Sequence, residues 1–439
     1  SSCYDRILIP LSSLIARGYG IHRNVVFVHA TNLENATYKL KIGKTTAPGE
    51  YTNTIKFSIH GSGQGAANSP TIWCFISSKL FQCHQEKAFG MTMLSPEGDI
   101  TLHMSMVGFV DDSTCLTGGS QQHTVKDMLN RMQSDAQLWH DLLWLSGGKL
   151  ELSKCGYHLI YYTFDLDGVP HLSHHTKYDT AFIDAIKLRT AHKSVIPIQA
   201  KSIYTPRKNL GHFKSPGGKF QIQATIILEK AKSFATSLTS SKVSRRDAKM
   251  LYQTIFRPTV EYTLPQAFLS DKQLKQIQTV SYSTIYSKCG FNRNSATNIM
   301  SGPAVLGGGG FAPLNAVAGT GHVANFLKYW RSPHSEPGKL VRILLSWTQY
   351  HSGVSFALLE ETKRDINHLE GRFIPAVRNY LADIGGQIIY TPTYIRQPLR
   401  KRDKFIMDLA MEAGFTKLQL KRINCVRLSV GATFLSEIT

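Results

Sequence analysis

Two adjacent aspartates, Asp111 and Asp112, are the residues of this chain whose type and spacing most directly suggest chemistry. Like charges repel, and neighbouring residues of a strand point to opposite faces, so a purely structural role for both carboxylates is difficult to explain. Mg²⁺ removes this difficulty because it takes oxygen ligands and usually uses one or two protein carboxylates, with phosphate and water completing its shell. The alternative is an ordinary polar hairpin turn.

The sequence around the aspartates predicts a β-hairpin with the pair at its tip. Apolar residues alternate with polar ones from 102 to 106, and the stretch after Asp112 leads into the Gly118-Gly119 pair, which ends it. Apolar residues at helical spacing over 125–144 predict an amphipathic helix that packs on the sheet. A second helix is predicted over 71–81, with Ser69 as its cap and Pro70 in its first turn.

Length and charge restrict the class of protein. A chain of 439 residues suggests two or three domains, and its net charge of +20 favours a polyanion such as nucleic acid as partner. No run of apolar residues is long enough to cross a membrane, so membrane attachment is not expected. The seven cysteines are widely spaced without a Cys-x-x-Cys pair, which favours a reducing, intracellular setting without structural zinc.

Five segments in order carry a resemblance to a known family. The hairpin residues Phe109-Val-Asp-Asp112 resemble the aromatic-x-Asp-Asp hairpin in the palm of reverse transcriptases. The other matching segments are Cys3-Tyr-Asp-Arg6, Gly61-Ser-Gly-Gln-Gly-Ala-Ala-Asn-Ser-Pro70, Gly147-Gly-Lys-Leu-Glu-Leu-Ser-Lys-Cys155 and Lys208-Asn-Leu-Gly211. The chain therefore resembles the RNA-directed DNA polymerase of a non-LTR retrotransposon.

The resemblance implies a role for each matched residue. Asp111 and Asp112 would be catalytic and hold two Mg²⁺ ions, which Mn²⁺ could replace, and Lys154 would protonate the departing pyrophosphate. The nucleotide or template would contact five residues: Tyr4, Gln64, Gly65, Phe109 and Val110. Leu210 and Gly211 would form the turn of the primer grip. A core tyrosine, a glycine-rich turn and a surface lysine are the structural alternatives for Tyr4, Gln64 and Lys154, and Glu151 replaces the Asn usual in the family's fourth motif.

The resemblance also implies an α+β fold of the right-hand polymerase type. It predicts a palm over 1–170 with an antiparallel sheet and packed helices, a connector over 171–215, a helical thumb over 216–300 and a basic, mostly helical region over 301–439. The metal-binding Asp that opens the first palm motif would fall two residues before Ser1, so we expect the chain to be a fragment of a longer protein, truncated at both ends.

Four further expectations concern the thumb region and the residues just after it. Ser244 is predicted to cap a helix that Pro258 stops, and another helix is predicted from about Leu274 to Ile285. Basic residues of this region suit either a primer–template backbone or a solvated face, namely Lys230, Lys232, Lys242, Arg245, Arg246 and Lys249. The run 307–310 lacks the neighbours of a phosphate-binding loop, which favours a turn.

The expected partners are an RNA template, a DNA primer and deoxynucleotides, in the nucleus and cytoplasm. Two alternatives to an active polymerase remain. The first is a catalytically inactive or domesticated relic that binds RNA or DNA, which the missing leading Asp would favour. The second is a nucleotide cyclase on a similar palm, but its Gly-Gly-acidic-acidic-Phe hairpin differs from Gly108-Phe-Val-Asp-Asp112.

Overall fold

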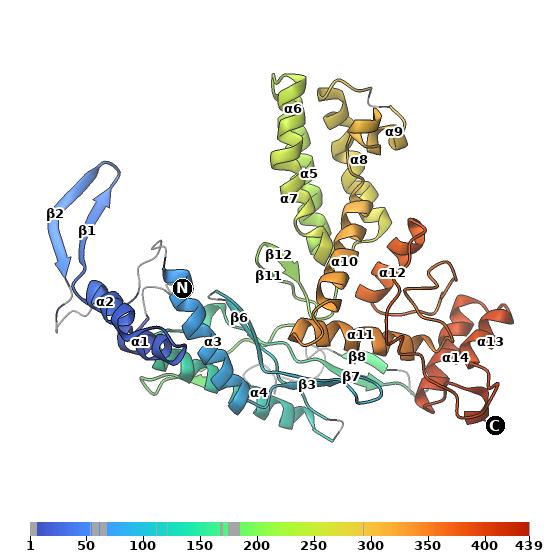
Figure 1. Cartoon of the computed structure of the whole chain (residues 1–439), viewed down its shortest axis with the longest axis horizontal. Coiled ribbons are helices and arrows are strands. Elements are labelled where there is room, and N and C mark those ends of the chain that lie inside the picture. Colours follow the sequence, from blue (N-terminus) through green and yellow to red (C-terminus); the bar gives the residue numbers. More distant parts are fainter. Residues whose placement is uncertain are drawn as a thin grey trace. The chain divides into compact units, whose positions relative to one another are not determined.

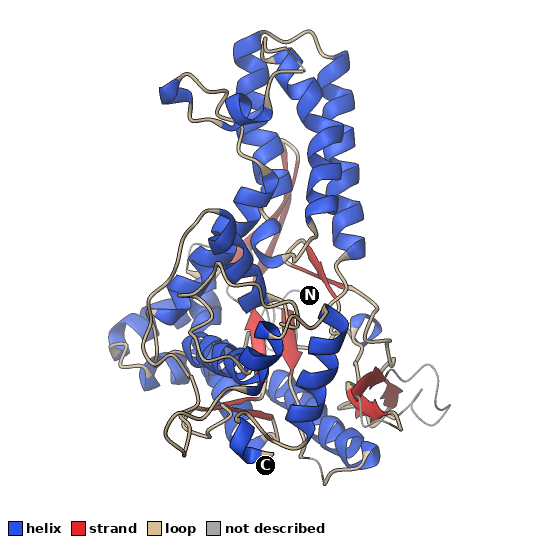
Figure 2. Cartoon of the chain, turned by 90° about the vertical axis from the view of Figure 1, so that its right-hand side faces the viewer, coloured by secondary structure: helices blue, strands red, loops and turns tan. Residues whose placement is uncertain are grey.

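The computed structural model describes residues 7–52, 54, 61, 68–110, 112–120, 122–166, 170–173, 185–292 and 294–438. The fold is α+β, with many helices and small two-stranded sheets (Figures 1 and 2). Every pair of strands whose register is defined runs antiparallel. The chain divides into two compact units, which are described separately.

The first unit comprises Ser1–Thr92, His103–Tyr161 and Ser173–Ser202. Its helices are α1 (Ile9–Gly18), α2 (Arg23–Glu34), α3 (Ser69–Lys87), α4 (Val125–Leu145) and the 3₁₀ turn η2 (Leu152–Lys154). Its paired strands are β1 (Thr37–Ile42) with β2 (Thr45–Thr52), β5 (Met106–Phe109) with β6 (Asp112–Cys115), and β9 (Lys187–Arg189) with β10 (Val195–Pro197). The division passes through a further pair, β3 (Met91–Leu94) with β4 (Thr101–Met104).

Helix α4 contributes to both apolar cores of the first unit. Trp139 and Leu143 pack with α3 in one core, and Leu129 packs with the β9 region in the other. A capping box starts the helix, in which the Thr124 hydroxyl accepts from the Asp127 amide and the Asp127 carboxylate accepts from the Thr124 amide. The predicted helices over 71–81 and 125–144 are therefore confirmed, α3 being longer than expected at both ends. Ser69 was wrongly predicted as the cap of α3, because it is the first residue of the helix and Asn68 precedes it as the N-cap.

The second unit comprises Met93–Leu102, Tyr162–Leu172 and Ile203–Thr439. Its strands form the pairs β7 (Tyr161–Phe164) with β8 (Pro170–Ser173) and β11 (Arg207–Asn209) with β12 (His212–Lys214). Its longer helices are α5 (Gln221–Ser240), α6 (Arg245–Leu251), α8 (Asp271–Lys288), α10 (Leu314–Trp330), α11 (Glu336–Ser352), α12 (Phe373–Asp383), α13 (Ile406–Glu412) and α14 (Lys417–Ser429). The shorter turns are α7 (Arg257–Glu261), α9 (Thr297–Ser301), η6 (Leu264–Gln266), η7 (Ala304–Leu306) and η8 (Leu435–Glu437).

Pro258 does not end the helix that begins after Ser244, so that prediction was wrong. A π-helical turn, η5 (Tyr252–Phe256), joins α6 to α7, and Pro258 lies in the first turn of α7. The Arg257 amide donates to the Tyr252 carbonyl in the wider π pattern, and the missing N–H of Pro258 costs little where a new turn begins. Of the aromatic and apolar segment 157–164, only Tyr161–Phe164 forms a strand, β7.

Arg427 holds the C-terminal part of the second unit together. Its side chain is 2% exposed and donates to the carbonyls of Tyr350 and His351 at 2.8 and 2.7 Å, at the end of α11. It also donates to the Asn424 side chain at 2.8 Å and to the Ala432 carbonyl at 3.3 Å. One guanidinium thus fixes α14 to α11 and to the turn that follows α14.

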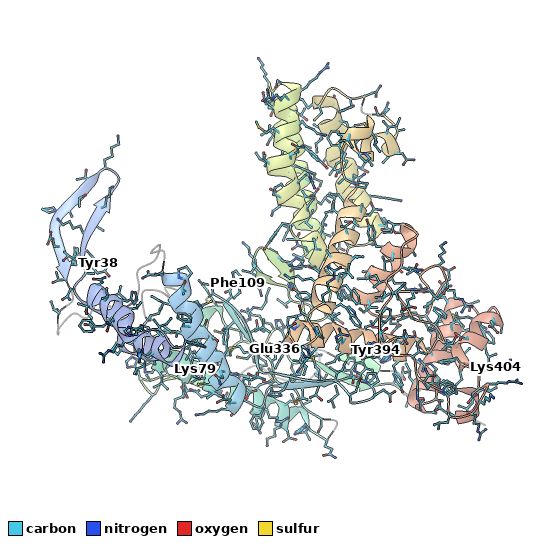
Figure 3. The ribbon with its side chains drawn as sticks, viewed as in Figure 1. Tyr38, Lys79, Phe109, Glu336, Tyr394 and Lys404 are labelled. Atoms are coloured by element: carbon cyan, nitrogen blue, oxygen red, sulfur yellow. The ribbon has the colours of Figure 1, made fainter. Side chains whose placement is uncertain are left out.

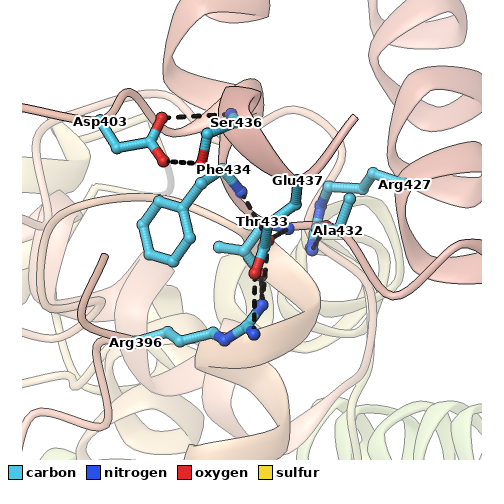
Figure 4. Close-up of polar contacts among 8 residues, drawn as sticks. All are labelled: Arg396, Asp403, Arg427, Ala432, Thr433, Phe434, Ser436 and Glu437. Atoms are coloured by element: carbon cyan, nitrogen blue, oxygen red, sulfur yellow. Dashed lines mark hydrogen bonds and ion pairs between the residues drawn. The ribbon is translucent and has the colours of Figure 1, made fainter. Parts of the chain in front are cut away.

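The chain after α14 closes with a second polar cluster (Figure 4). Glu437 accepts from the backbone amides of Thr433 and Phe434 at 2.6 and 3.0 Å and forms an ion pair with Arg396 at 2.8 Å. Asp403 accepts from the Ser436 hydroxyl nearby. In the part of the chain that is described, no helix is long and apolar enough to cross a membrane.

Replacing Arg427 by Leu is expected to lower the free energy of unfolding by about 3 kcal/mol. Three backbone carbonyls lose a charged donor in a buried place, and each unsatisfied group costs free energy. Urea denaturation of the full chain measures the change. Arg422→Leu, on an exposed position of the same helix, is the matched control, and an equal loss in both variants would contradict the assigned role of Arg427.

Candidate functional site

The predicted hairpin is present as β5 and β6. Met106 pairs with Cys115 and Phe109 pairs with Asp112, so two residues, Val110 and Asp111, connect the strands. The extended segment that leads into the tip is interrupted at Ser105, because β4 ends at Met104 and β5 begins at Met106. Ser105 lies between them with its amide donating to the Gln85 side chain at 2.8 Å, which explains the interruption.

Val110 adopts a left-handed backbone conformation at the hairpin tip, with φ of 52°. Two-residue hairpins need positive φ at the turn, but a β-branched residue pays a steric cost there. The indole of Trp73, on α3, donates to the Val110 carbonyl at 2.6 Å. A hydrogen bond from a helix therefore holds the strained turn in place.

A second tryptophan holds the returning strand. The Trp139 indole, on α4, donates to the Ser113 hydroxyl at 3.0 Å, and its ring lies 5.4 Å from that of Phe81. Phe81 in turn packs directly on Gly108, where an added Cβ would lie 2.1 Å from the Phe81 Cζ. Gly108 is therefore required by the close approach of an aromatic ring from α3.

A buried polar network supports the hairpin from behind. Asp135 is 1% exposed and accepts from the amides of Phe89 and Gly90 and from the Thr117 hydroxyl, at 2.8, 3.2 and 2.7 Å. His84, fully buried, contacts the Ser105 hydroxyl at 2.8 Å and the Asp135 carbonyl at 3.1 Å, and burial lowers its pKa. Sequence reasoning missed both residues. An acid one turn before Trp139, on the buried side of an amphipathic helix, was the available signal.

The tip presents three of the predicted residues to solvent. Phe109, labelled in Figure 3, is 56% exposed, Val110 is 39% exposed and Asp112 is exposed at the start of β6. Asp111, Tyr4, Gln64 and Gly65 lie outside the described residues, so their predicted roles stay predictions. An exposed carboxylate at a two-residue turn can reach a metal ion without moving the strands.

Lys154 ends the turn η2, and its side chain is exposed. Leu152 and Cys155, on either side of it, are partly buried in the core that α4 shares with β9. Leu150 of the same segment and Cys115, at the end of β6 that lies away from the tip, pack against one apolar core, and burial raises the pKa of Cys115 to about 12. The Lys154 segment therefore runs beside the hairpin.

Glu151, which departs from the family pattern, has a local structural role. The Ser153 hydroxyl donates to its carboxylate at 2.7 Å, which lowers the pKa of Glu151. Its backbone carbonyl accepts from the Lys154 amide at 2.9 Å. Glu151 thus organises the turn that carries Lys154.

The Leu210-Gly211 turn belongs to the second unit. It joins β11 and β12 as a two-residue hairpin turn with φ of 49° and 80°, and the Tyr262 hydroxyl donates to the Leu210 carbonyl at 3.2 Å. The Phe213 amide donates to Gln223 at 2.8 Å, which ties the hairpin to α5. The turn is present as predicted, and its role as a primer grip stays a prediction.

Most basic residues predicted for a nucleic-acid backbone are exposed on α5 and around the start of α6. Lys249 is the exception, because its ammonium donates to the Gly309 carbonyl at 2.6 Å and lies 3.7 Å from the Phe311 ring centroid. The run 307–310 is an internally bonded turn: the amides of Gly308, Gly309 and Gly310 donate to the carbonyls of Pro303, Ile299 and Gly302. Because these amides already donate hydrogen bonds to backbone carbonyls, the run does not form a phosphate-binding loop.

Metal binding depends on residues that are only partly described. Among the described residues, no group of three or more His, Cys, Asp or Glu side chains could hold a metal ion. Asp112 alone offers the hard oxygen that Mg²⁺ prefers, and Asp111 lies outside the described part. The exposed tip fits an ion that takes few protein ligands and completes its shell with phosphate and water.

Replacing Val110 by Asn is expected to raise the free energy of unfolding by about 1 kcal/mol. Asn tolerates the left-handed region, whereas a β-branched side chain is strained there. Urea denaturation measures the change, with Val107→Asn as control because Val107 is similarly exposed but lies within β5. An equal destabilisation of both variants would show that the turn carries no strain.

Acid is expected to destabilise the second unit through His212. This residue is 3% exposed, neither of its ring nitrogens has a hydrogen-bond partner among the described residues, and burial, followed by Lys214, lowers its pKa to about 4. The unfolded chain binds a proton near pH 6.5 and the folded chain does not, so stability falls between pH 6.5 and 4, by about 3 kcal/mol.

His322 has the same lowered pKa, about 4, through burial, so acid destabilises the unit through both residues, and His212→Leu is expected to remove about half of their combined loss. The measurement is urea denaturation at pH 7 and pH 4.5. His334→Gln, an exposed position, serves as control. If His212→Leu leaves the pH dependence unchanged, His212 does not carry it.

Comparisons with known proteins do not identify the chain. A scan of the sequence against protein-family models found no match, and a search of curated proteins also found none. Assignment of function therefore depends on the motif order and on the geometry of the hairpin.

Proposed function

We propose that the chain is the polymerase region of an RNA-directed DNA polymerase of the non-LTR retrotransposon type. The observation that carries the proposal is the β5–β6 hairpin, in which a two-residue turn places Asp112 beside exposed Phe109 at a tip that Trp73 holds rigid. An exposed carboxylate at a fixed turn suits metal-dependent phosphoryl chemistry, which needs positioned ligands. The order of the five motifs supports the same proposal.

The residues of the chain have separate tasks in this proposal. Asp111 and Asp112 hold the catalytic ions, and bound Mg²⁺ would supply activation of the primer hydroxyl and stabilisation of the leaving group. Lys154 donates a proton to the departing pyrophosphate. Phe109 and Val110 contact the nucleotide or template at the tip. The two tryptophan hydrogen bonds fix the position of the turn against which these groups act.

Other parts of the chain have matching tasks. Tyr4 excludes a ribose 2′-hydroxyl, and Gln64 with Gly65 positions the template–nucleotide pair. Leu210 and Gly211 present a tight turn to the primer end. The exposed lysines and arginines of α5 and α6 contact the backbone of the primer–template, in keeping with the net charge of +20.

Primer extension on poly(rA)–oligo(dT) with Mg²⁺ and dTTP tests the proposal. The tested protein is the chain together with any residues encoded directly before Ser1, where the resemblance places a further metal ligand. Incorporation is expected, and Asp111→Asn is expected to abolish it. Lys154→Ala is expected to lower the rate by about 10²- to 10⁴-fold, the usual contribution of a general acid.

Two exposed residues outside the five motif segments provide matched controls: Lys126→Ala for Lys154 and Glu34→Gln for Asp111. Both controls are expected to keep full incorporation. A protein that binds the duplex but never extends the primer would overturn the proposal and favour the alternative function, a nucleic-acid-binding relic without catalysis. Extension that survives Asp111→Asn would equally overturn it.

A further inference from the structure

A pocket of about 670 Å³ lies in the first unit on the outer face of α4, among residues that none of the proposed polymerase roles use. One stripe of α4 lines it, spaced i, i+4, i+7, i+8 and i+11: Gln133, Gln137, His140, Asp141 and Trp144. The opposite wall comes from β9 and the loop after it. The buried side of α4, with Trp139 and Leu143, faces the core instead.

Two glutamines seal the strand edge that borders this pocket. Gln133 accepts from the Lys187 amide and donates to the Lys187 carbonyl, both at 2.6 Å. Gln137 does the same at Arg189, at 2.8 and 3.0 Å. These bonds occupy the backbone groups that an added strand would need, so recognition by strand addition is excluded here. Any ligand must be recognised by side chains.

An exposed aromatic ring and two cations are the side chains available. Trp144 is 45% exposed, and its ring lies 6.1 Å from that of His192, edge to face. Lys187 and Arg189 line the pocket with exposed side chains, and their backbones are fixed by the glutamines. An aromatic face beside fixed cations is the combination that binds a base together with its phosphate.

The loop between β9 and β10 is ordered before any ligand binds. The Thr190 amide donates to the Ser194 carbonyl and the Lys193 amide donates to the Thr190 carbonyl, each at 2.9 Å. The hydroxyls of Thr190 and Ser194 lie 2.6 Å apart. His192 is therefore held beside Trp144, and the pocket needs little ordering on binding.

We propose that this pocket binds single-stranded nucleic acid, with one base stacked on Trp144 and adjacent phosphates on Lys187 and Arg189. Asp141 lies one turn before Trp144 on the same face of α4, where it accepts from Gln137 at 2.8 Å and pairs with His140 at 3.3 Å. A carboxylate repels phosphate but accepts a hydrogen bond from an exocyclic amino group. The pocket therefore favours cytosine over uracil, which lacks that group.

The test uses the full chain labelled with 5-fluorotryptophan, which gives one ¹⁹F resonance for each of its five tryptophans. Trp144→Phe identifies the Trp144 resonance by its loss. Titration with an eight-nucleotide oligo(rC) at low salt is expected to shift this resonance more than the other four. Oligo(rU) is expected to bind less tightly, and Asp141→Ala is expected to remove the difference between the two.

Charge variants test the phosphate contacts with the same resonance. Lys187→Gln with Arg189→Gln is expected to weaken binding by about 10-fold or more, and to reduce the slope of log affinity against log salt by roughly 1 to 2. The matched control is Lys79→Gln with Lys126→Gln, which removes two exposed charges from α3 and α4 outside the pocket. The control pair is expected to leave binding at Trp144 nearly unchanged.

Two results would overturn the proposal: an unshifted Trp144 resonance at saturating oligonucleotide, or an equal loss of affinity in the two charge variants. The titration is repeated in the Asp111→Asn chain, where binding at the pocket is expected to be unchanged. A chain that fails to extend a primer yet binds oligo(rC) at Trp144 overturns the polymerase proposal alone. A chain that extends a primer but does not bind oligo(rC) at Trp144 overturns only the proposal for the pocket.

Discussion

The hydrogen bond from the Trp73 indole to the Val110 carbonyl is the constraint around which the first unit is arranged. The turn it holds has a backbone conformation that a valine adopts only under external restraint. Helix α3 must therefore lie against the hairpin, and Phe81 and Gly108 make that approach close enough. Helix α4 adds the bond from Trp139 to β6, and the network of Asp135 and His84 fixes the two helices behind the strands.

Short two-stranded sheets create a recurring problem of open edges, and this chain meets it with glutamine side chains. Gln85 donates to the His103 carbonyl and accepts from the Ser105 amide, while Gln133 and Gln137 seal β9. In the second unit Gln349 makes the same pair of bonds to a loop, donating to the Phe356 carbonyl and accepting from the Leu358 amide. A side-chain amide on a helix thus replaces a neighbouring strand.

Local signals in the sequence were sufficient for the elements that local interactions determine. The apolar spacing of α4, the capping residue before α6, Pro70 at the start of α3 and the Leu210-Gly211 turn all predicted what is present. Features that depend on residues far away in the sequence could not be predicted from the sequence. Pro258 is tolerated because a π turn precedes it, β5 begins late because Gln85 binds Ser105, and Asp135 is buried because Phe89, Gly90 and Thr117 donate to it. The exposed tip was predicted, whereas the tryptophans that hold it were not.

The hydrogen bonds from Gln133 and Gln137 to β9 also affect the chemical stability of the protein. A glutamine amide both donates and accepts hydrogen bonds and carries no charge, so these bonds do not weaken with acid or salt as those of a charged side chain would. Deamidation, however, converts the amide into a carboxylate that only accepts. At Gln133 or Gln137, a carboxylate oxygen would then replace the amide nitrogen that now donates to the carbonyl of Lys187 or Arg189. Two acceptor oxygens would face each other and repel. Deamidation at either position would therefore remove one bond of the pair and leave the edge of β9 open to another strand.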